Sequence, residues 1–264
     1  MPVTEMESRS RIRVVSACDR DGEAGAQKSR AGSAVYLSEV LSEIDQGAGF
    51  LDRLTLNEIN AVRKFASPML FQPGNSVFLQ GDIHSGIFLI DSGRVRIYYA
   101  GPSGREITLA YWTPGHFIGG PEVFGGGVHM WSAVVVEPSR LSYLPAAKLK
   151  QLAMTVPAFA VALIEGLVAK GKCYSALVQM LGTRSVTERL AQLLIILASV
   201  ERQEAGSHLV IDKRITHEQL ASIVGSTRQW VTSTLARFHK AGIIRIDRGR
   251  IHIERPEALS QDLE

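Results

Sequence analysis

The residues best suited to chemistry lie in the stretch GSTRQWVTSTLARFHKAGII, which spans residues 225–244. Within it Val231, Leu235 and Phe238 repeat at helical spacing and predict a buried stripe, which leaves the polar side chains on the opposite face. Arginine can donate two hydrogen bonds to guanine O6 and N7, and glutamine can bond to adenine N6 and N7 in the same way. The outer face therefore has the groups needed to recognise base edges in a DNA major groove. Its residues are Arg228, Gln229, Thr232, Ser233 and Arg237.

The segments around this helix predict a winged helix-turn-helix. THEQLASIVG forms a preceding helix with a Thr-x-x-Gln capping box, and Gly225 supplies the tight turn. SVTERLAQLLIILASVE predicts an earlier helix, HLVIDKRI a short strand, and IIRIDRGRIHI a hairpin. Hydroxyl groups and free N–H groups at helix starts suit phosphate oxygens, whereas the simpler interpretation is a solvated helix face with ordinary caps. The further DNA contacts predicted here are Ser226, Thr227, Thr216, His217 and Arg248.

Charge and composition narrow the class of protein. The 264 residues carry a net charge of +3, yet residues 184–255 hold 12 Lys/Arg against 7 Asp/Glu, which favours a polyanionic partner for that part. No apolar run approaches the ~20 residues of a membrane span, and the first residues lack a signal-peptide pattern, so we expect a cytoplasmic protein without a membrane partner. Two cysteines, Cys18 and Cys173, exclude a disulfide scaffold, an all-cysteine zinc site and a cysteine-ligated iron–sulfur cluster from one chain.

The N-terminal half has a different sequence pattern. Residues 1–33 are polar and without periodicity, and we interpret them as a flexible tail. LDRLTLNEINAVRKFA (51–66) has helical spacing with Thr55 as the N-cap. From 68 to 145, short β-branched and aromatic runs alternate with Gly- and Pro-containing turns, which is typical of an all-β barrel or roll.

A long helix is predicted over residues 157–182. Apolar residues from Val156 and Ala160 onward follow alternating spacings of four and three, the seam of a two-stranded coiled coil. The alternative is a helix packed on its own domain. Lys170 and Tyr174 interrupt the seam, which suggests that something polar meets the helix there. The predicted dimer interface consists of Leu163, Leu167, Lys170, Tyr174, Leu177 and Leu181.

The segments FIGGPEVFGGGVHMWSAVVV, SVTERLAQLLIILA and THEQLASIVGSTRQWVTSTLARFHKAGII together resemble the Crp/Fnr family of bacterial transcription regulators, over about residues 36–255. The resemblance implies an α+β chain with a cyclic-nucleotide-binding-like β-roll, a dimerisation helix and a winged helix-turn-helix. It also implies a homodimer on palindromic double-stranded DNA, with RNA polymerase as a further partner. The expected parts are a tail (1–33), an effector roll (34–155), the helix (156–183), the DNA-binding domain (184–255) and a C-terminal tail (256–264).

The same resemblance argues against cyclic AMP as the effector. The family position for the ribose-binding glutamate corresponds to Gly120, and the phosphate-binding Arg-Ser pair corresponds to Trp131-Ser132. A cyclic phosphate without its arginine loses a bidentate, charge-assisted anchor. The adenine-contacting pair of the long helix corresponds to Tyr174-Ser175. We place the effector pocket at Trp131, Ser132, Tyr174, Ser175, Lys170, Gly120 and Glu122.

The effector itself stays unassigned. Two aromatic side chains and one lysine would suit an aromatic carboxylate or phenolate; alternatively, these side chains fill the pocket and no effector is needed. Haem would require axial ligands, for which His116, His129 and Met130 are the candidates, and Cys173 could sense oxidants. A binding module without DNA function is a further alternative. No metal cluster, catalytic triad or phosphate-cradling lysine loop points to an enzyme or to a cofactor.

Overall fold

The computed structural model describes residues 13–14, 50–51, 54–120, 122–205, 209–211 and 215–261. The chain divides into two compact units. We call the described residues of 13–14, 50–97 and 112–166 the roll unit, and those of 98–111 and 167–261 the helical unit. The predicted boundary at residues 155 and 156 therefore differs from the structural one, which falls within the long helix, and residues 98–111 group with the helical unit rather than with the roll.

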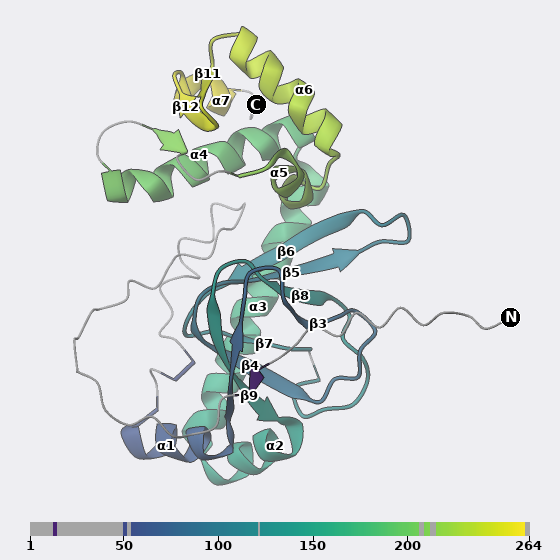
Figure 1. The fold of residues 1–264 in the computed structure, drawn as a ribbon, viewed down its shortest axis with the longest axis vertical. Helices are drawn as coiled ribbons and strands as arrows, with labels where there is room; N and C mark the ends of the chain where they lie inside the picture. Colours follow the sequence, from purple (N-terminus) through teal and green to yellow (C-terminus); the bar gives the residue numbers. More distant parts are fainter. Residues whose placement is uncertain are drawn as a thin grey trace, which may run out of the picture. The chain divides into compact units, whose positions relative to one another are not determined.

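The strands of the roll form two antiparallel sheets, as the alternation of strands and turns predicts (Figure 1). One sheet has the order β1-β2-β9-β4-β7 and the other β3-β8-β5-β6. Tight turns of this roll use glycines at positive φ, for example Gly93 at 88° and Gly115 at 91°, where other residues would be strained. The strands are β1 (Arg13–Val14), β2 (Ser67–Phe71), β3 (Ser76–Phe78), β4 (Gly86–Ser92), β5 (Val95–Ala100), β6 (Glu106–Trp112), β7 (Phe117–Ile118), β8 (Ser132–Val135) and β9 (Ser139–Pro145).

Two short helices lie at the same end of these strands (Figure 1). The first, α1 (Leu56–Phe65), begins with the predicted cap: Thr55 and Glu58 form a reciprocal capping box. The second, α2 (Ala146–Thr155), was not predicted, because its sequence follows β9 directly without a capping residue. Burial holds α2 in place, since Leu149 and Leu152 are almost inaccessible to solvent.

The helical unit contains the winged helix-turn-helix. Its core joins α4, α5, α6 and the small sheet β10-β12-β11 around buried apolar side chains such as Leu193, Val231 and Phe238. The elements are α3 (Pro157–Thr183, from Leu167 onward in this unit), α4 (Val186–Ala205), β10 (Val210–Ile211), α5 (His217–Val224), α6 (Arg228–Lys240), β11 (Ile244–Asp247), β12 (Arg250–Ile253) and α7 (Pro256–Gln261).

Both predicted tails need correction. Residues 256–261 form α7 rather than a tail, because Leu259 is fully buried in the core of the helical unit. In the predicted N-terminal tail, Arg13–Val14 pairs with β2 as the edge strand β1; the rest of the tail lies outside the described residues. The segment 256–261 is therefore part of the folded unit because the core of that unit buries Leu259, which the local sequence does not show.

Candidate DNA-binding surface and effector region

The helix α6 is held by its inner face and exposes its outer face. Val231, Leu235 and Phe238 are at most 2% exposed, as the spacing predicts. Before it, Gly225 adopts φ 67° at the end of α5, a left-handed conformation that glycine tolerates without strain. Thr227 caps α6 by accepting a hydrogen bond from the Trp230 N–H at 3.2 Å. The start of α6 is therefore fixed by a turn, a cap and a buried stripe.

The first two residues of α6 are available for a partner. Arg228 and Gln229 are exposed, and neither side chain forms a hydrogen bond or ion pair within the described part of the chain. Arg228 thus keeps five N–H donors, and Gln229 keeps a donor and an acceptor. Both project from the N-terminal end of the helix, where the unpaired N–H groups and helix dipole also favour anions.

The next polar residues are partly engaged. Thr232 donates to the Arg228 carbonyl at 2.9 Å and lies 2.8 Å from Nδ1 of His217 on α5. Because the threonine proton is used, His217 must donate, so this bond links the two helices of the motif. Ser233 donates to the Trp230 carbonyl at 2.9 Å, which leaves its oxygen able to accept. Ser233 is therefore suited to a base or water that donates.

Several other residues in or near the helix-turn-helix already make contacts within the helical unit. Arg237 is exposed, but its guanidinium reaches back to the Thr187 hydroxyl of α4 at 3.5 Å. Trp230 is half-buried and packs against the core of the helical unit, so its indole supports the helix rather than extending outward. Thr216 is the α5 N-cap in a complete capping box with Gln219. Ser226 donates its backbone N–H to Ala221, completing the turn.

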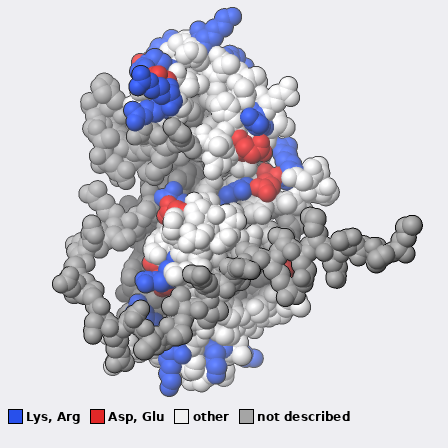
Figure 2. All heavy atoms as spheres, viewed as in Figure 1, with Lys and Arg blue, Asp and Glu red and all other residues white. Residues whose placement is uncertain are grey.

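The wing formed by β11 and β12 ends in a strained, basic turn. Arg248 adopts φ 47° and Gly249 φ 83°, positive values at both central residues of the two-residue loop. A non-glycine residue in this conformation costs on the order of 1 kcal/mol or more, and such strain is concentrated at functional sites. Basic side chains gather over this part of the molecule, with acidic ones beside them (Figure 2). One of them, Arg245, is already paired with Glu254 at 2.9 Å, which leaves the tip arginine as the better candidate for a phosphate.

The tip of the β5–β6 hairpin supports the turn between α5 and α6. Arg105 donates to the carbonyl of Gly225. Thr108 and Ser222 are both buried, with hydroxyl oxygens 3.0 Å apart. Since Ser222 donates to the Gln219 carbonyl, Thr108 must be the donor in the pair. The sequence did not predict this support, because the hairpin precedes α5 by more than a hundred residues.

Four of the predicted effector residues belong to the roll unit. Gly120 and Ser132 are buried, Trp131 is half-buried and Glu122 is exposed. Ser132 accepts a hydrogen bond from the backbone N–H of Gln80 at 3.0 Å, so its hydroxyl already holds the roll together. A Cβ at position 120 would lie 2.8 Å from Cδ2 of His84. No side chain, and no glutamate, fits at this position unless His84 moves.

The buried His84 adjoins this glycine, and a second buried histidine, His129, lies against His84; only His129 stood out in the sequence. The rings of His84 and His129 lie 4.8 Å apart, and His129 stacks on Phe78 at 3.8 Å. Neither nitrogen of His84, nor Nδ1 of His129, has a hydrogen-bond partner among the described residues. Burial lowers the pKa of His129 to about 4, with a smaller contribution from His84, while Asp82 acts in the opposite direction. Burial also lowers the pKa of His84, against a weaker opposing effect of Glu122.

The other three predicted effector residues belong to α3 in the helical unit. Lys170 is 9% exposed, Tyr174 is half-buried and Ser175 is exposed. Burial lowers the pKa of Lys170 to about 7, although the neighbouring Cys173 acts to raise it. Lys170 therefore lies on the buried face of α3, and Ser175 lies on the exposed face.

Comparisons with known proteins match this architecture. The cyclic nucleotide-binding domain family matches residues 68–156, and the Crp-like helix-turn-helix domain family matches residues 188–262. The chain belongs to the Crp/Fnr family of bacterial transcription regulators. The α+β fold predicted from the sequence is confirmed, as is its classification as a DNA-binding regulator rather than an enzyme.

Individual members of the Crp/Fnr family show how far the likeness extends. The global nitrogen regulator of Synechococcus elongatus is 27% identical over 193 residues, covering 72% of this chain and 87% of the relative. The CRP-like cAMP-activated global transcriptional regulator of Mycobacterium tuberculosis is 27% identical over 84% of this chain and 99% of the relative. The structure of a c-di-GMP responsive global regulator from Xanthomonas campestris has a TM-score of 0.67 at 20% identity, covering 75% of this chain and 99% of that one.

In this Crp/Fnr chain, most of the predicted dimer seam lies on a face of α3 that packs within the chain itself. Leu163 is 3% exposed and Lys170 is 9% exposed, and Leu177 and Leu181 pack against the core of the helical unit. Leu167 and Tyr174 of that seam are half-buried. The exposed stripe lies one residue further along, again with alternating spacings of three and four. It consists of Val161, Ile164, Val168, Gly171, Ser175, Val178 and Gly182. Because α3 carries apolar residues all round, the sequence contains two such stripes, and only burial separates them.

The candidate haem and thiol sensors do not fit their surroundings. His129 lies flat on Phe78, Met130 is 58% exposed, and His116 lies in a different pocket, so the three candidate ligands do not converge. Cys173 is 2% exposed, and burial raises its pKa to about 12, although Lys170 acts to lower it. A buried thiol that resists deprotonation is poorly suited to sensing oxidants. No helix among the described residues is both long and apolar enough to span a membrane.

Proposed function

We propose that the protein is a homodimeric, sequence-specific DNA-binding regulator whose effector is not cyclic AMP. The observation that carries the proposal is the pair Arg228 and Gln229, exposed and without side-chain partners among the described residues, at the start of a helix that is fixed on its other side. Fixed donors at a helix start are what direct readout of base edges requires.

The side chains of α6 suggest distinct roles on the DNA. Arg228 bonds guanine O6 and N7 in each half-site, Gln229 contacts the adjoining base pair, and Ser233 accepts from an amino group of a base. The Thr227 hydroxyl, which accepts from the Trp230 N–H, keeps its own proton and donates to a phosphate oxygen at the helix start, while the bond between His217 and Thr232 holds α5 and α6 together beside it.

The exposed stripe of α3 supplies the dimer contact. Val161, Ile164, Val168 and Val178 are each at least 50% exposed, a costly arrangement for a helix in a monomer. Pairing two such stripes as a parallel coiled coil buries them and relates two copies of α6 by two-fold symmetry. The DNA site is then palindromic, with half-sites about 34 Å apart, and RNA polymerase is the expected neighbour on the promoter.

The region around Gly120 supports an effector other than cyclic AMP. His84 occupies the space next to Gly120, and Trp131 stands where the phosphate-binding arginine is expected. Without a glutamate for the ribose and an arginine for the phosphate, the nucleotide would leave both polar groups poorly matched. The relative activated by cyclic AMP thus does not provide a guide to the ligand of this chain.

The test is a mobility-shift assay with a palindrome selected from randomised DNA. Replacing Arg228 with alanine should weaken binding by about 1–3 kcal/mol, roughly 5- to 150-fold, and relax the preference for guanine. Lys150→Ala, an exposed change on α2, serves as the control and should have no effect. If no palindrome gives salt-sensitive binding, or if Arg228→Ala binds as tightly as the original protein, the chain is a binding module and the proposal fails.

A further inference from the structure

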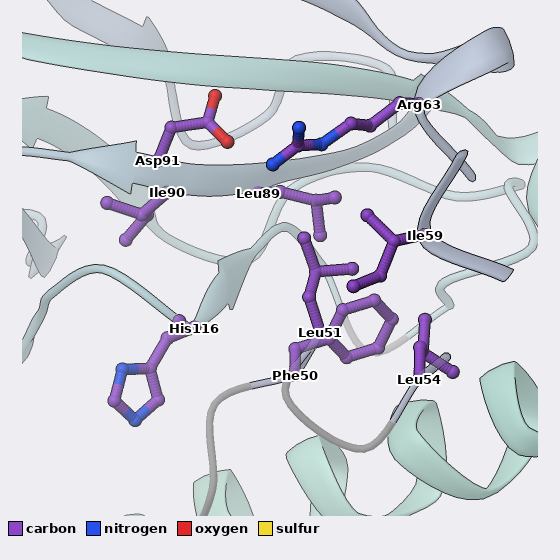
Figure 3. A pocket seen from close by; sticks show the side chains of 10 residues that line it. Phe50, Leu51, Leu54, Ile59, Arg63, Leu89, Ile90, Asp91 and His116 are labelled. Atoms are coloured by element: carbon purple, nitrogen blue, oxygen red, sulfur yellow. The ribbon is translucent and has the colours of Figure 1, made fainter. Parts of the chain in front are cut away.

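A separate pocket lies in the roll unit beneath α1. Its cavity of about 330 Å³ lies between α1, the end of β4 and the turn before β7. Apolar side chains form most of the wall, and three polar side chains, Arg63, Asp91 and His116, also line it (Figure 3). None of the residues assigned to the effector region lines this pocket. Its apolar residues are Phe50, Leu51, Leu54, Ile59, Leu89 and Ile90.

Hydrogen bonds between the walls hold the pocket open in one shape. The N–H of Ile90 donates to the carbonyl of His116 at 2.9 Å, and the N–H of Gly115 donates back to Ile90 at 3.2 Å. The N–H of Phe50 donates to the carbonyl of Gly115 at 2.5 Å, and its ring packs edge-on against Phe117 at 5.4 Å. Walls joined in this way are preorganised, so a ligand does not have to order them.

Two opposite charges face each other at one side of this cavity. Arg63 extends from α1 with its guanidinium directed toward the carboxylate of Asp91 (Figure 3). The two do not form an ion pair, and Arg63 has no other side-chain partner among the described residues. Asp91 lies at a bulge of β4, where the register with β9 shifts, and a bulge redirects a side chain.

The carboxylate of Asp91 accepts a hydrogen bond from the protein but has only a weak ion-pair partner. Its side chain is 20% exposed, and Oδ2 accepts a hydrogen bond from the Ser142 hydroxyl at 2.7 Å. Its ion-pair partner among the described residues is Arg140, whose Nε lies 4.0 Å away and whose side chain is 59% exposed, so this contact is weak. A mostly buried carboxylate with so little compensation favours a further donor.

We propose that this pocket binds a small zwitterion with an apolar side chain, of the class of the free α-amino acids. The ligand carboxylate pairs with the guanidinium of Arg63, the ammonium donates to Asp91, and the side chain packs on Leu51, Leu54 and Ile59. A simple anion would be repelled by the carboxylate of Asp91, and a simple cation would be repelled by the guanidinium of Arg63. Only a ligand that carries both charges satisfies both walls.

The size of the cavity agrees with such a ligand. Ligand pockets span about 300–1,000 Å³, so this one, at about 330 Å³, is at the compact end of the range. A dinucleotide is too large and too anionic for it. This inference goes beyond the proposed function, and binding can be measured without DNA, so it can fail or hold independently of DNA recognition.

Calorimetric titration of the full chain with leucine, methionine and phenylalanine tests the proposal. Each lost charge-assisted contact should weaken binding at least about tenfold. Leucinamide lacks the carboxylate and N-acetyl-leucine lacks the ammonium, so both should bind at least about tenfold more weakly than leucine. These ligand changes require no altered protein, which keeps the test valid if a variant folds poorly.

Two variants then test which side chain pairs with each charge of the ligand. Arg63→Ala should bind leucine and leucinamide with the same reduced affinity, because the carboxylate has lost its partner. Asp91→Asn, which keeps the acceptor for Ser142, should bind leucine and N-acetyl-leucine alike. Lys64→Ala, exposed on the same helix, should bind leucine as the original chain does. Absence of binding by every free amino acid at millimolar concentration overturns the proposal, as does equal affinity for the three leucine forms or an undiminished affinity in Arg63→Ala.

Discussion

The stability of the roll unit should fall between pH 7.5 and pH 5, because two histidines are buried in the neutral form. His129 has an ordinary pKa of 6.5 in the unfolded chain and a pKa of about 4 in the folded chain. The unfolded chain therefore binds a proton in this interval that the folded chain excludes. The stabilisation is complete above about pH 6.5, is lost as the pH falls toward 4, and changes no further below that.

The magnitude follows from these two pKa values. At pH 5 the unfolded His129 is about 1.5 pH units below its pKa, while the folded one is still neutral. Since each pKa unit corresponds to about 1.4 kcal/mol, His129 alone should remove about 2 kcal/mol from the free energy of unfolding. The pKa of His84 is lowered by the same burial, so its contribution has the same sign.

Urea unfolding followed by tryptophan fluorescence can measure this loss, because Trp112 is buried in the same unit and Trp131 is close to His129 in the chain. With an m-value of about 2 kcal/mol/M, the midpoint should fall by about 1 M from His129 alone. His129→Phe keeps a ring to stack on Phe78 and should reduce the pH dependence by about 2 kcal/mol. Gln72→Ala, an exposed change of a group that does not titrate in the same unit, should leave it unaltered. An equal pH dependence in the original chain and in His129→Phe would refute the reasoning.

Three further outcomes are expected. Gly120→Ala should lower the free energy of unfolding by about 1–3 kcal/mol through overpacking, and adding His84→Ala should recover most of that loss; additive effects in the double variant would contradict the contact. Thr108→Val should destabilise the helical unit by about 1 kcal/mol in chemical denaturation, because Ser222 loses its donor, whereas an unchanged midpoint would show that the bond contributes nothing. Val168→Glu should shift sedimentation from dimer to monomer while Val168→Leu stays dimeric; two dimeric variants would place the interface elsewhere.

Much of the helical unit could be predicted from the sequence. Local signals specify it: the Thr216–Gln219 capping box, the glycine turn and the spacing of Val231 and Leu235 each depend on residues within one or two helical turns. The outward position of Arg228 follows from that spacing alone. The roll was predictable for the same reason, since turns and alternating strands are local patterns.

The choice of face on α3 was not predictable. Two apolar stripes one residue apart have equal spacing, and the chain buries Leu163 and Lys170 while exposing Ile164 and Val168. The helix α7 was also missed, because its stability depends on Leu259 entering a core assembled from distant segments. Hydrophobic burial is non-local, so periodicity identifies a stripe without identifying what covers it.

The pocket features depended most strongly on tertiary structure. The bulge that presents Asp91, the position of Arg63 across the cavity and the contact between His84 and Gly120 each join segments that are 20 residues or more apart. The sequence by itself determined the family and the helix-turn-helix, because those are short motifs with fixed spacing. Tertiary structure decided which charges face each other and which side chains lose water, because these depend on distances in space rather than along the chain.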